Sequence, residues 1–237
     1  MTDSKKVAIL QSSYIPWKGY FDLINQVDEF ILYDDAQYTK NDWRNRNIIK
    51  TAQGPQWLTI PVRQARLGQT VRDTKVADAR WAGKHWASVS QNYSKASHFG
   101  ELGPRFEQLY LSMDSEYLSD VNYQFIRAVN ESLGITTRIR WSSEFELVEG
   151  RTERLIGICK QAGATEYVSG PAAREYFDMA LARREQIEVS WMDYSGYPEY
   201  EQLHPPFDHK VSILDLLFNV GVSARQYMKS FAAGTCW

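Results

Sequence analysis

A β-strand, a helix and a second β-strand are predicted within the first 35 residues, and this arrangement constrains the fold most. Residues 6–10, KVAIL, form a short apolar run typical of a strand, and residues 29–35, EFILYDD, form another. Between them, the apolar side chains of residues 21–27 recur at helical spacing. Ligands of such βαβ units lie beyond the carboxyl ends of the strands. Residues 11–20 and the end of the second strand are therefore predicted to share one edge of a sheet.

The alternation of strands and helices returns in the second half of the chain. Strands are predicted at residues 137–143, 166–170 and 187–194, and helices at residues 152–163, from Pro171 onward, and at residues 209–221. Pro171 suits the first turn of its helix, and the last helix has one apolar face on which it would dock. These patterns predict an α/β fold with a mostly parallel, Rossmann-like sheet.

The middle of the chain departs from this alternation. Residues 36–56 are polar and rich in Asn, and we expect them to form a loop. The β-type runs 57–62 and 71–77 are predicted to pair as a hairpin at the edge of the sheet. Residues 79–135 have a largely helical pattern and are predicted to be a helical insertion or subdomain. A chain of 237 residues with 43% hydrophobic content suits one α/β domain over residues 1–237.

Composition limits the partners and the compartment. The 27 basic and 29 acidic residues give a formal charge of −2, so no net positive field attracts duplex nucleic acid. Cys159 and Cys236 are too far apart in the sequence to indicate a disulfide framework or a metal site. Neither a signal-peptide core nor a membrane-spanning run is present in the sequence, so we expect a cytoplasmic protein without membrane insertion.

Several common catalytic motifs are absent from the sequence. It has no Gly-rich dinucleotide fingerprint, no P-loop, no G-x-S-x-G turn and no zinc-binding motif. A typical dehydrogenase, a P-loop kinase, an α/β-hydrolase and a zinc enzyme are therefore disfavoured, and no metal ligands are assigned.

Candidate binding residues gather at the predicted edge of the sheet. Lys18 and Gly19 lie at a strand-to-helix junction, where unpaired backbone N–H groups favour an anion, or where Gly19 serves only the turn. The segment 40–47, KNDWRNRN, interleaves Arg44 and Arg46 with an aromatic ring, as suits phosphates and a stacked ring, although a solvated basic loop would have the same composition. Further aromatic and polar candidates for substrate binding are Gln11, Tyr14, Trp17, Tyr20, Tyr38, Trp43 and Tyr197.

Acids and bases for catalysis are fewer. Asp34 and Asp35 follow the second strand, where a carboxylate could accept a proton or bind Mg²⁺ through water, or where both could end the strand in a turn. Among four histidines, His85 and His209 are the candidates for a general base, against the alternative that each packs or caps a helix. His204 and His209 are five residues apart, which fits no single helical face for a metal.

Several long motifs together resemble one known family. They are LQSSYIPWKGYFDLI, DEFILYDDAQYTKNDWRNRN, WLTIPV, YVSGPAAREY, YPEYEQL and FDHKVSILDLLFNVG, which span most of the chain. This set is similar to the WbqC-like protein family, whose members are typically encoded among bacterial genes for O-antigen and other surface polysaccharides. The resemblance implies a transferase, with glycine transfer to an amino sugar as one proposal for the family.

A second resemblance concerns the layout of two turns. The turn P-x-x-G-aromatic at residues 16–20 and YVSGPAARE at residues 167–175 are arranged like the phosphate-binding turns of HIGH-type nucleotidyltransferases and pantothenate synthetase. This likeness implies a HUP-like sheet and a reaction that uses ATP and Mg²⁺. Trp17 or Lys18, and Tyr20, stand where that signature has histidines, which is a departure from the pattern.

The leading hypothesis is a transferase that attaches a small acyl or aminoacyl group to the amine of a nucleotide-linked sugar. His85 or His209 would be the base, oriented by Asp34 or Asp35, and Lys18, Arg44 and Arg46 would meet the diphosphate. Ser169, Gly170 and Arg174 would form a second anion site. The activated acyl donor remains open between an ATP-derived adenylate, a coenzyme A thioester and a charged tRNA. The alternatives are a nucleotidyltransferase-like or ATP-dependent amide ligase, and a sugar-nucleotide-binding or scaffold protein without catalysis.

Overall fold

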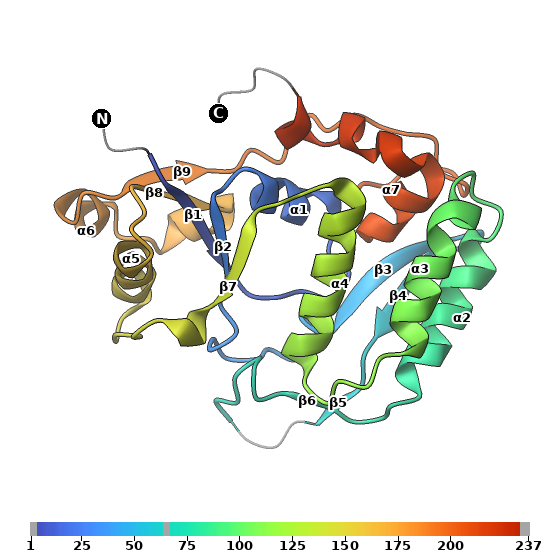
Figure 1. Cartoon of the computed structure of the whole chain (residues 1–237), viewed down its shortest axis with the longest axis horizontal. Coiled ribbons are helices and arrows are strands. Elements are labelled where there is room, and N and C mark those ends of the chain that lie inside the picture. Colours follow the sequence, from blue (N-terminus) through green and yellow to red (C-terminus); the bar gives the residue numbers. More distant parts are fainter. Residues whose placement is uncertain (1–3, 64–66, 233–237) are drawn as a thin grey trace.

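Five parallel strands form the central sheet of the molecule. The computed structural model describes residues 4–63 and 67–232, and its sheet has the order β7–β2–β1–β8–β9 (Figure 1). The strands are β1 (Lys6–Leu10), β2 (Glu29–Leu32), β7 (Arg138–Trp141), β8 (Glu166–Ser169) and β9 (Glu188–Trp191). The predicted α/β, Rossmann-like architecture is confirmed. The strand order reverses between β1 and β8, which is where ligands bind in open sheets of this kind.

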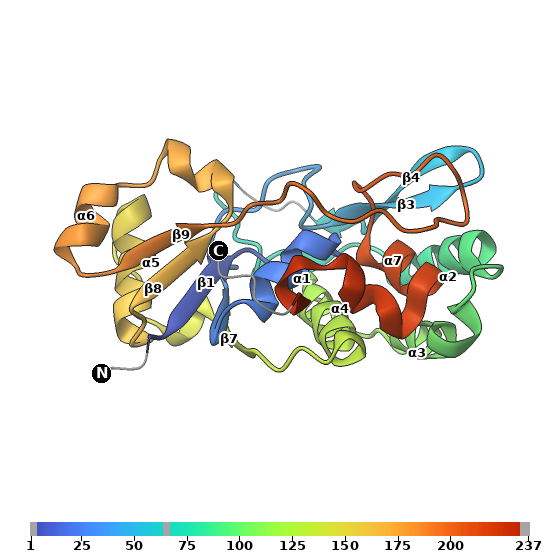
Figure 2. The ribbon, with the colours of Figure 1, turned by 90° about the horizontal axis from the view of Figure 1, so that it is seen from above.

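Side chains of alternating direction on the strands join the sheet to two layers of helices. Val7 and Ile9 of β1 pack with buried residues of α5 (Arg151–Gln161) and α6 (Met179–Arg184). Ala8, between them, faces the larger core that includes α1 (Lys18–Asn25). Figure 2 shows α5 and α6 at one end of the molecule and α2 and α3 at the other, with α1 and α4 between them. The period of two along each strand thus buries both faces of the sheet.

The segment between β2 and β7 holds two hairpins and three helices. It contains β3 (Arg46–Thr51), β4 (Gly54–Thr59), β5 (Val62–Arg63), β6 (Lys75–Val76), α2 (Trp81–Tyr93), α3 (Phe99–Leu111) and α4 (Leu118–Leu133). Buried side chains of all three helices belong to the same core cluster as α1. The bounds of α2, α3 and α4 confirm the helical character of residues 79–135, and their role as an insertion or subdomain stays a prediction.

The predictions for residues 36–62 were wrong in part. Residues 46–51, expected in a loop, form β3 and pair with β4, whereas the run 71–77 contributes only β6, which pairs with β5. Neither hairpin joins the five-stranded sheet in the part of the chain that the structure describes. The sequence pattern did not predict β3 because two of its buried residues, Asn47 and Lys50, are polar. Both side chains form hydrogen bonds with segments distant in the sequence.

Two helix predictions in the second half also needed correction. The helix expected from Pro171 is instead a short 3₁₀ turn, η2 (Pro171–Glu175), and α6 begins only where the Asp178 carboxylate accepts hydrogen bonds from two backbone N–H groups. The last helix, α7 (Ile213–Val220), starts four residues later than residue 209, because the Ser212 hydroxyl caps it. Its apolar face is buried in the core, as predicted. The short 3₁₀ helices η1 (Ser142–Glu144), η3 (Gly221–Tyr227) and η4 (Lys229–Phe231) complete the structure.

The C-terminal end of the described chain is tied to its beginning. The Asp22 carboxylate in α1 accepts hydrogen bonds from the backbone N–H groups of Lys229 and Ser230, each at 3.0 Å. The Lys229 ammonium donates to the carbonyl oxygens of Asp193 and Ser195, at 3.0 and 2.9 Å. One short segment thus fastens α1 to the loop that follows β9.

Candidate functional site

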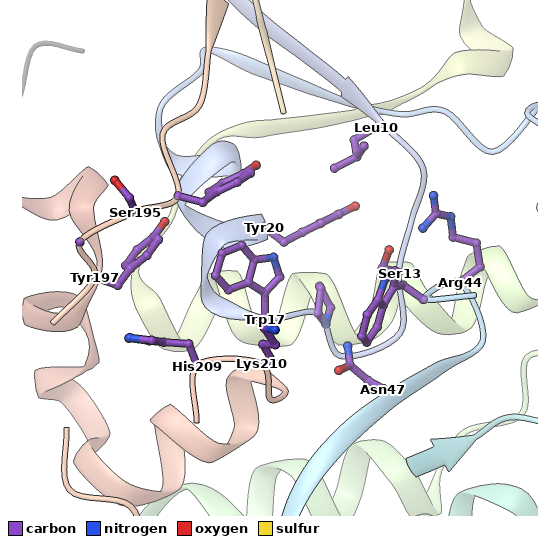
Figure 3. Close-up of a pocket in the computed structure, with 14 residues that line it drawn as sticks. Leu10, Ser13, Trp17, Tyr20, Arg44, Asn47, Ser195, Tyr197, His209 and Lys210 are labelled. Atoms are coloured by element: carbon purple, nitrogen blue, oxygen red, sulfur yellow. The ribbon is translucent and has the colours of Figure 1, made fainter. Parts of the chain in front are cut away.

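A cavity of about 820 Å³ lies at the carboxyl end of β1, beside the reversal of strand order. Its walls come from the end of β1, the β1–α1 loop and the start of α1, from the loop before β3 and the start of β3, and from the segments 194–197 and 209–210, the second of which lies just before α7. Figure 3 shows Trp17 near its centre, with Arg44 and His209 on opposite sides of the indole. The volume and the aromatic lining suit a small-molecule ligand with at least one ring. We call this space the aromatic cavity.

The indole of Trp17 is the central surface of the aromatic cavity. Its ring meets the rings of Tyr194 and Tyr197 edge to face, with centroids 5.1 and 5.7 Å away. A Cβ atom added to Gly19 would overlap the six-membered ring of Trp17. The indole therefore lies directly on the backbone of α1, and Gly19 is what permits this approach.

The loop that carries Trp17 has an unusual backbone conformation. Ile15 has a φ angle of 37°, in the left-handed region that β-branched residues avoid. The Asn47 side-chain amide holds the loop by donating to the carbonyl oxygens of Tyr14 and Ile15, at 2.9 and 3.1 Å. Such strain costs on the order of 1–3 kcal/mol and persists only where the surroundings impose it. The hydrogen bonds from Asn47 thus fix the conformation of the loop next to the aromatic cavity.

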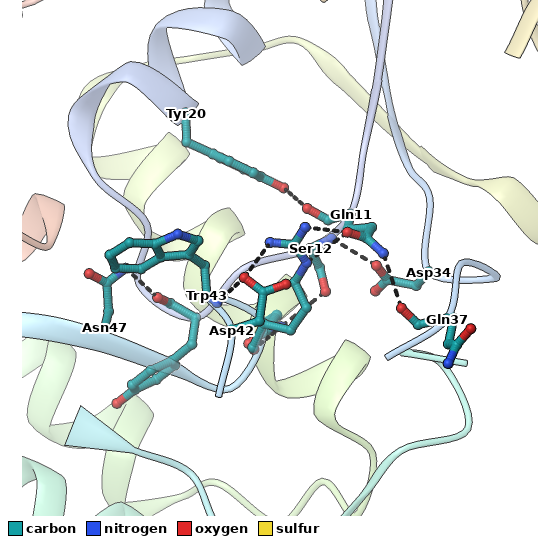
Figure 4. Close-up of polar contacts among 11 residues, drawn as sticks. Gln11, Ser12, Tyr20, Asp34, Gln37, Asp42, Trp43 and Asn47 are labelled. Atoms are coloured by element: carbon teal, nitrogen blue, oxygen red, sulfur yellow. Dashed lines mark hydrogen bonds and ion pairs between the residues drawn. The ribbon is translucent and has the colours of Figure 1, made fainter. Parts of the chain in front are cut away.

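Arg44 supplies a fixed positive charge on one side of the aromatic cavity. Its Nε donates to Oε1 of Gln11 at 2.8 Å, its Nη2 makes a second bond to the same oxygen, and its Nη1 lies 3.5 Å from the Asp42 carboxylate. Gln11 is held in turn by the Tyr20 hydroxyl, which donates to its carbonyl oxygen at 3.1 Å (Figure 4). A guanidinium fixed in this way suits a phosphate or carboxylate of a ligand.

His209 lies on the opposite side of the indole, near Lys210. Its ring packs edge-on against Phe207, with centroids 4.5 Å apart, and its buried Nδ1 has no hydrogen-bond partner among the residues that the structure describes. Burial lowers the pKa of His209, and the positive charge of Lys18 lowers it further. A histidine kept neutral at the wall of a cavity is suited to accept a proton.

Lys18 is only 4% exposed and does not line the aromatic cavity. Its ammonium donates to the carbonyl oxygen of Pro198 at 3.1 Å and lies 4.8 Å from the centroid of the Tyr197 ring. Burial lowers the pKa of Lys18 to about 8. It lies behind the wall, next to His209 and Tyr200, rather than at the position expected for a phosphate ligand.

The two aspartates after β2 have different surroundings, and neither lines the aromatic cavity. Asp34 is 1% exposed, and its carboxylate accepts hydrogen bonds from the backbone N–H of Ser12, at 2.7 Å, and from the Ser119 hydroxyl. Burial raises the pKa of Asp34 despite these bonds. Asp35 is more exposed and contacts the Ser142 hydroxyl and Arg72. Residues 11–20 and the end of β2 do meet at one edge, as predicted, and Asp34 joins them.

His85 lies in the core, within α2. It is 7% exposed, and its Nδ1 is 2.9 Å from the hydroxyl of Tyr14, which is itself hydrogen-bonded to Tyr110. Burial lowers the pKa of His85 to about 4. Neither His85 nor Tyr14 lines the aromatic cavity, so the structure places His209, and not His85, where it could reach a ligand.

The buried position of His85 predicts a loss of stability in acid. The unfolded chain binds a proton on His85 below pH 6.5, whereas the folded chain does so only near pH 4. The contribution of the neutral His85 to the free energy of unfolding is therefore complete above pH 6.5, and it is lost as the pH decreases toward 4. We expect His85 alone to lower the free energy of unfolding by about 2 kcal/mol between roughly pH 7 and pH 5, measured by denaturant unfolding. His85→Gln should reduce this loss, and His98→Gln, at a more exposed histidine, should not. Equal pH dependence in the two variants would contradict the argument.

The remaining predicted binding residues lie outside the lining of the aromatic cavity. Tyr38 is buried, and its backbone N–H pairs with Gln69. Arg46 stacks over Trp57 at 4.1 Å, on the outer face of the β3–β4 hairpin.

The predicted second anion site at the end of β8 is only partly connected to the cavity. Gly170 approaches it, since a Cβ atom there would be 3.8 Å from the Tyr194 hydroxyl. Ser169 instead accepts a hydrogen bond from Tyr167, and Arg174 stacks over Trp191 at 5.5 Å.

The aromatic cavity also has lining residues that the sequence analysis did not select. They are Leu10, Ser13, Pro16, Asn47, Tyr194, Ser195, Gly196 and Lys210. Tyr194 ends the predicted strand 187–194, and Ser195 and Gly196 follow it, so the rule that ligands lie beyond strand ends could have identified them. Asn47 and Lys210 had no such signal, because tertiary contacts bring them to the site.

The described residues contain neither a membrane-spanning helix nor a cluster of metal ligands. Within residues 4–63 and 67–232, no helix combines the length and the apolar character needed to cross a bilayer. Over the same ranges, no three His, Cys, Asp or Glu side chains are grouped as a metal site would require. Cys159 is buried in α5, and Cys236 lies outside the described residues.

Comparison of the sequence with known proteins shows to which family the chain belongs. The model of the WbqC-like protein family matches residues 11–227. The chain belongs to this family. It is also 52% identical over 226 residues to the uncharacterized protein Rv1507c of Mycobacterium tuberculosis, a match that covers 95% of this chain and 98% of the relative. No solved structure matches the chain. The match to the WbqC-like family confirms the resemblance seen in the motifs and includes every residue named above for the aromatic cavity except Leu10.

Proposed function

We propose that this WbqC-like protein is a cytoplasmic transferase that attaches a small acyl or aminoacyl group, glycine being one candidate, to the amine of a nucleotide-linked sugar in surface-polysaccharide (O-antigen) synthesis. The observation that carries the proposal is the aromatic cavity, in which the Trp17 indole lies between a fixed guanidinium, Arg44, and a neutral histidine, His209. With the sugar ring on Trp17 and the diphosphate near Arg44, the amine of the sugar would be directed toward His209.

The reaction balances with an activated acyl donor such as a thioester or an acyl adenylate. The sugar amine attacks the carbonyl carbon, a C–N bond forms, and the bond from that carbon to the thiolate or adenylate leaving group breaks. His209 takes the proton that the amine loses, as a neutral imidazole can. Lys210 lines the same side and would stabilise the negative charge that develops on the carbonyl oxygen. Asp34 and Gln11 would act indirectly, by holding the loop and Arg44.

The first test is a ligand panel read by thermal unfolding, with UDP-N-acetylglucosamine, a UDP-linked amino sugar, ATP with Mg²⁺, and acetyl-coenzyme A. We expect the sugar nucleotides to raise Tm in proportion to the logarithm of their concentration. Arg44→Ala should weaken their binding about tenfold, equivalent to about 1.4 kcal/mol, because a charge-assisted contact is lost. Arg127→Ala, at an exposed site in α4, should leave binding unchanged.

The same panel separates the competing functions. Stabilisation by ATP with Mg²⁺ alone would support the adenylating alternative, and sugar-nucleotide binding without turnover of any acyl donor would support a binding or scaffold role. Once turnover is measured, His209→Gln should reduce it at least a hundredfold while binding persists. Unchanged turnover would show that His209 is not the base.

A further inference from the structure

Two exposed tryptophans lie together beside the aromatic cavity. Trp43 is 45% exposed and Trp57 is 44% exposed, and their ring centroids are 5.3 Å apart with the planes inclined by 35°. The guanidinium of Arg46 lies over the Trp57 ring, 4.1 Å from its centroid. We call these three residues the tryptophan platform.

The geometry of the β3–β4 hairpin explains why the platform faces outward. Trp57 pairs with Ile48, so Arg46, two residues earlier on β3, shares its face of the hairpin. The neighbouring Leu58 points to the opposite face and is buried in the core. The core packs on the face of the hairpin that contains Leu58, and the tryptophan platform lies on the opposite, exposed face.

Exposed aromatic side chains are ordinary when they are isolated. Among residues 4–63 and 67–232, Trp43 and Trp57 are the exposed aromatic residues whose rings contact each other. Arg46 has no ion-pair partner among those same residues, and its buried Nε has no hydrogen-bond partner there. The platform thus combines an apolar surface with a positive charge that forms no ion pair with a carboxylate of the described residues.

Trp43 connects the platform to the aromatic cavity, because it lines the cavity and also contacts Trp57. A ligand that extends out of the cavity past Trp43 would lie against the tryptophan platform. We propose that the platform is a second subsite, which binds a further sugar ring attached to the nucleotide-linked amino sugar that occupies the cavity. This proposal rests on the proposed function, since it assumes that the cavity takes the nucleotide-linked sugar.

The chemistry of a sugar ring matches the platform. A pyranose has a face of C–H groups that can pack on an indole, and a rim of hydroxyl oxygens that can accept hydrogen bonds from a guanidinium. Specific sites for small molecules combine such apolar area with a few polar groups in the same way. Trp57 is then a specificity residue for the length of the saccharide, and it takes no part in the transfer step.

The test follows the indole N–H resonances of the uniformly ¹⁵N-labelled full chain by NMR, with chitotriose and UDP-N-acetylglucosamine as separate probes. We expect chitotriose to shift the resonance of Trp57 and UDP-N-acetylglucosamine to shift that of Trp17, whereas Trp43, which lines the cavity and contacts Trp57, responds to both. Trp57→Ala should weaken chitotriose binding at least tenfold and leave UDP-N-acetylglucosamine binding unchanged, while Trp57→Phe should retain most of the affinity for chitotriose.

Tyr176→Ala is the matched control, because Tyr176 is an exposed aromatic residue with Arg151 over its ring, at 5.3 Å, and it does not line the cavity. It should leave both affinities unchanged. Chitotriose binding that depends on Trp57 but no UDP-N-acetylglucosamine binding would support the subsite and count against the proposed function. UDP-N-acetylglucosamine binding without chitotriose binding would overturn the subsite alone.

Two other occupants of the tryptophan platform have distinct outcomes. If uridine monophosphate shifted the Trp57 resonance, the platform would hold a base, and the sugar subsite would be wrong. If the wild-type chain sedimented as a dimer and Trp57→Ala as a monomer, the platform would be a protein interface, which would also overturn the proposal.

Discussion

Gly19→Ala is expected to lower the affinity for the nucleotide-linked sugar at least tenfold and the free energy of unfolding by about 2 kcal/mol. The added methyl group would overlap the Trp17 ring, which is confined on its other sides by Tyr194 and Tyr197. The indole must therefore move, and the surface on which the ligand ring is proposed to stack is lost. Isothermal titration and denaturant unfolding measure the two effects.

Gly83→Ala is the matched control for this substitution. Gly83 lies within α2, and a Cβ atom there would meet no atom within 4 Å. Because alanine favours a helix more than glycine, this variant should gain about 1 kcal/mol of stability and keep its ligand affinity. If both glycine variants behaved alike, the close packing of Trp17 on Gly19 would not control the cavity.

Asp34→Ala is expected to lower the free energy of unfolding by about 3 kcal/mol, because it leaves the buried N–H of Ser12 and the hydroxyl of Ser119 without their acceptor. The loss should appear in denaturant unfolding. Ligand affinity should fall as well, since Ser12 belongs to the loop that carries Trp17. Asp34→Asn, which keeps an oxygen in place, should lose about 1 kcal/mol.

The neighbouring aspartate provides the comparison. Asp35 bonds to Ser142 and to the half-exposed Arg72, so Asp35→Ala should cost no more than about 1 kcal/mol. Similar losses for the two alanine variants would mean that burial of Asp34 does not set its role. A fall in turnover in Asp34→Asn without a change in stability or affinity would indicate a direct catalytic part instead.

Local patterns were sufficient to predict the parallel sheet. The runs 6–10 and 29–35 each contain a strand, since burial on both faces favours continuous apolar residues, and the mixed run 166–170 contains another. The β3 strand could not be recognised in this way. Asn47 and Lys50 are polar and yet buried, and their hydrogen-bond partners, the loop at Tyr14 and the side chain of Gln202, are distant in the sequence.

The candidate site was predictable where residues follow a strand. The turn that contains Trp17 and Tyr20, and the loop that contains Trp43 and Arg44, do line one cavity. The environment of Lys18 was not predictable, because the segment that buries it, around Pro198, is 180 residues away in the sequence. Contacts between segments far apart in the sequence also place His209, and not His85, at the cavity wall. The residues next to each histidine in the sequence do not distinguish the two.

The hydrogen bonds that join Asp22, Lys229 and the loop after β9 have a consequence for folding during synthesis. One wall of the aromatic cavity is translated among the first 47 residues, and the opposite wall is residues 194–210. The segment that fastens the two is translated later still. A nascent chain can therefore assemble its β1–α1–β2 unit early, but it completes the aromatic cavity only after residues 194–210 and the segment that contains Lys229 have left the ribosome.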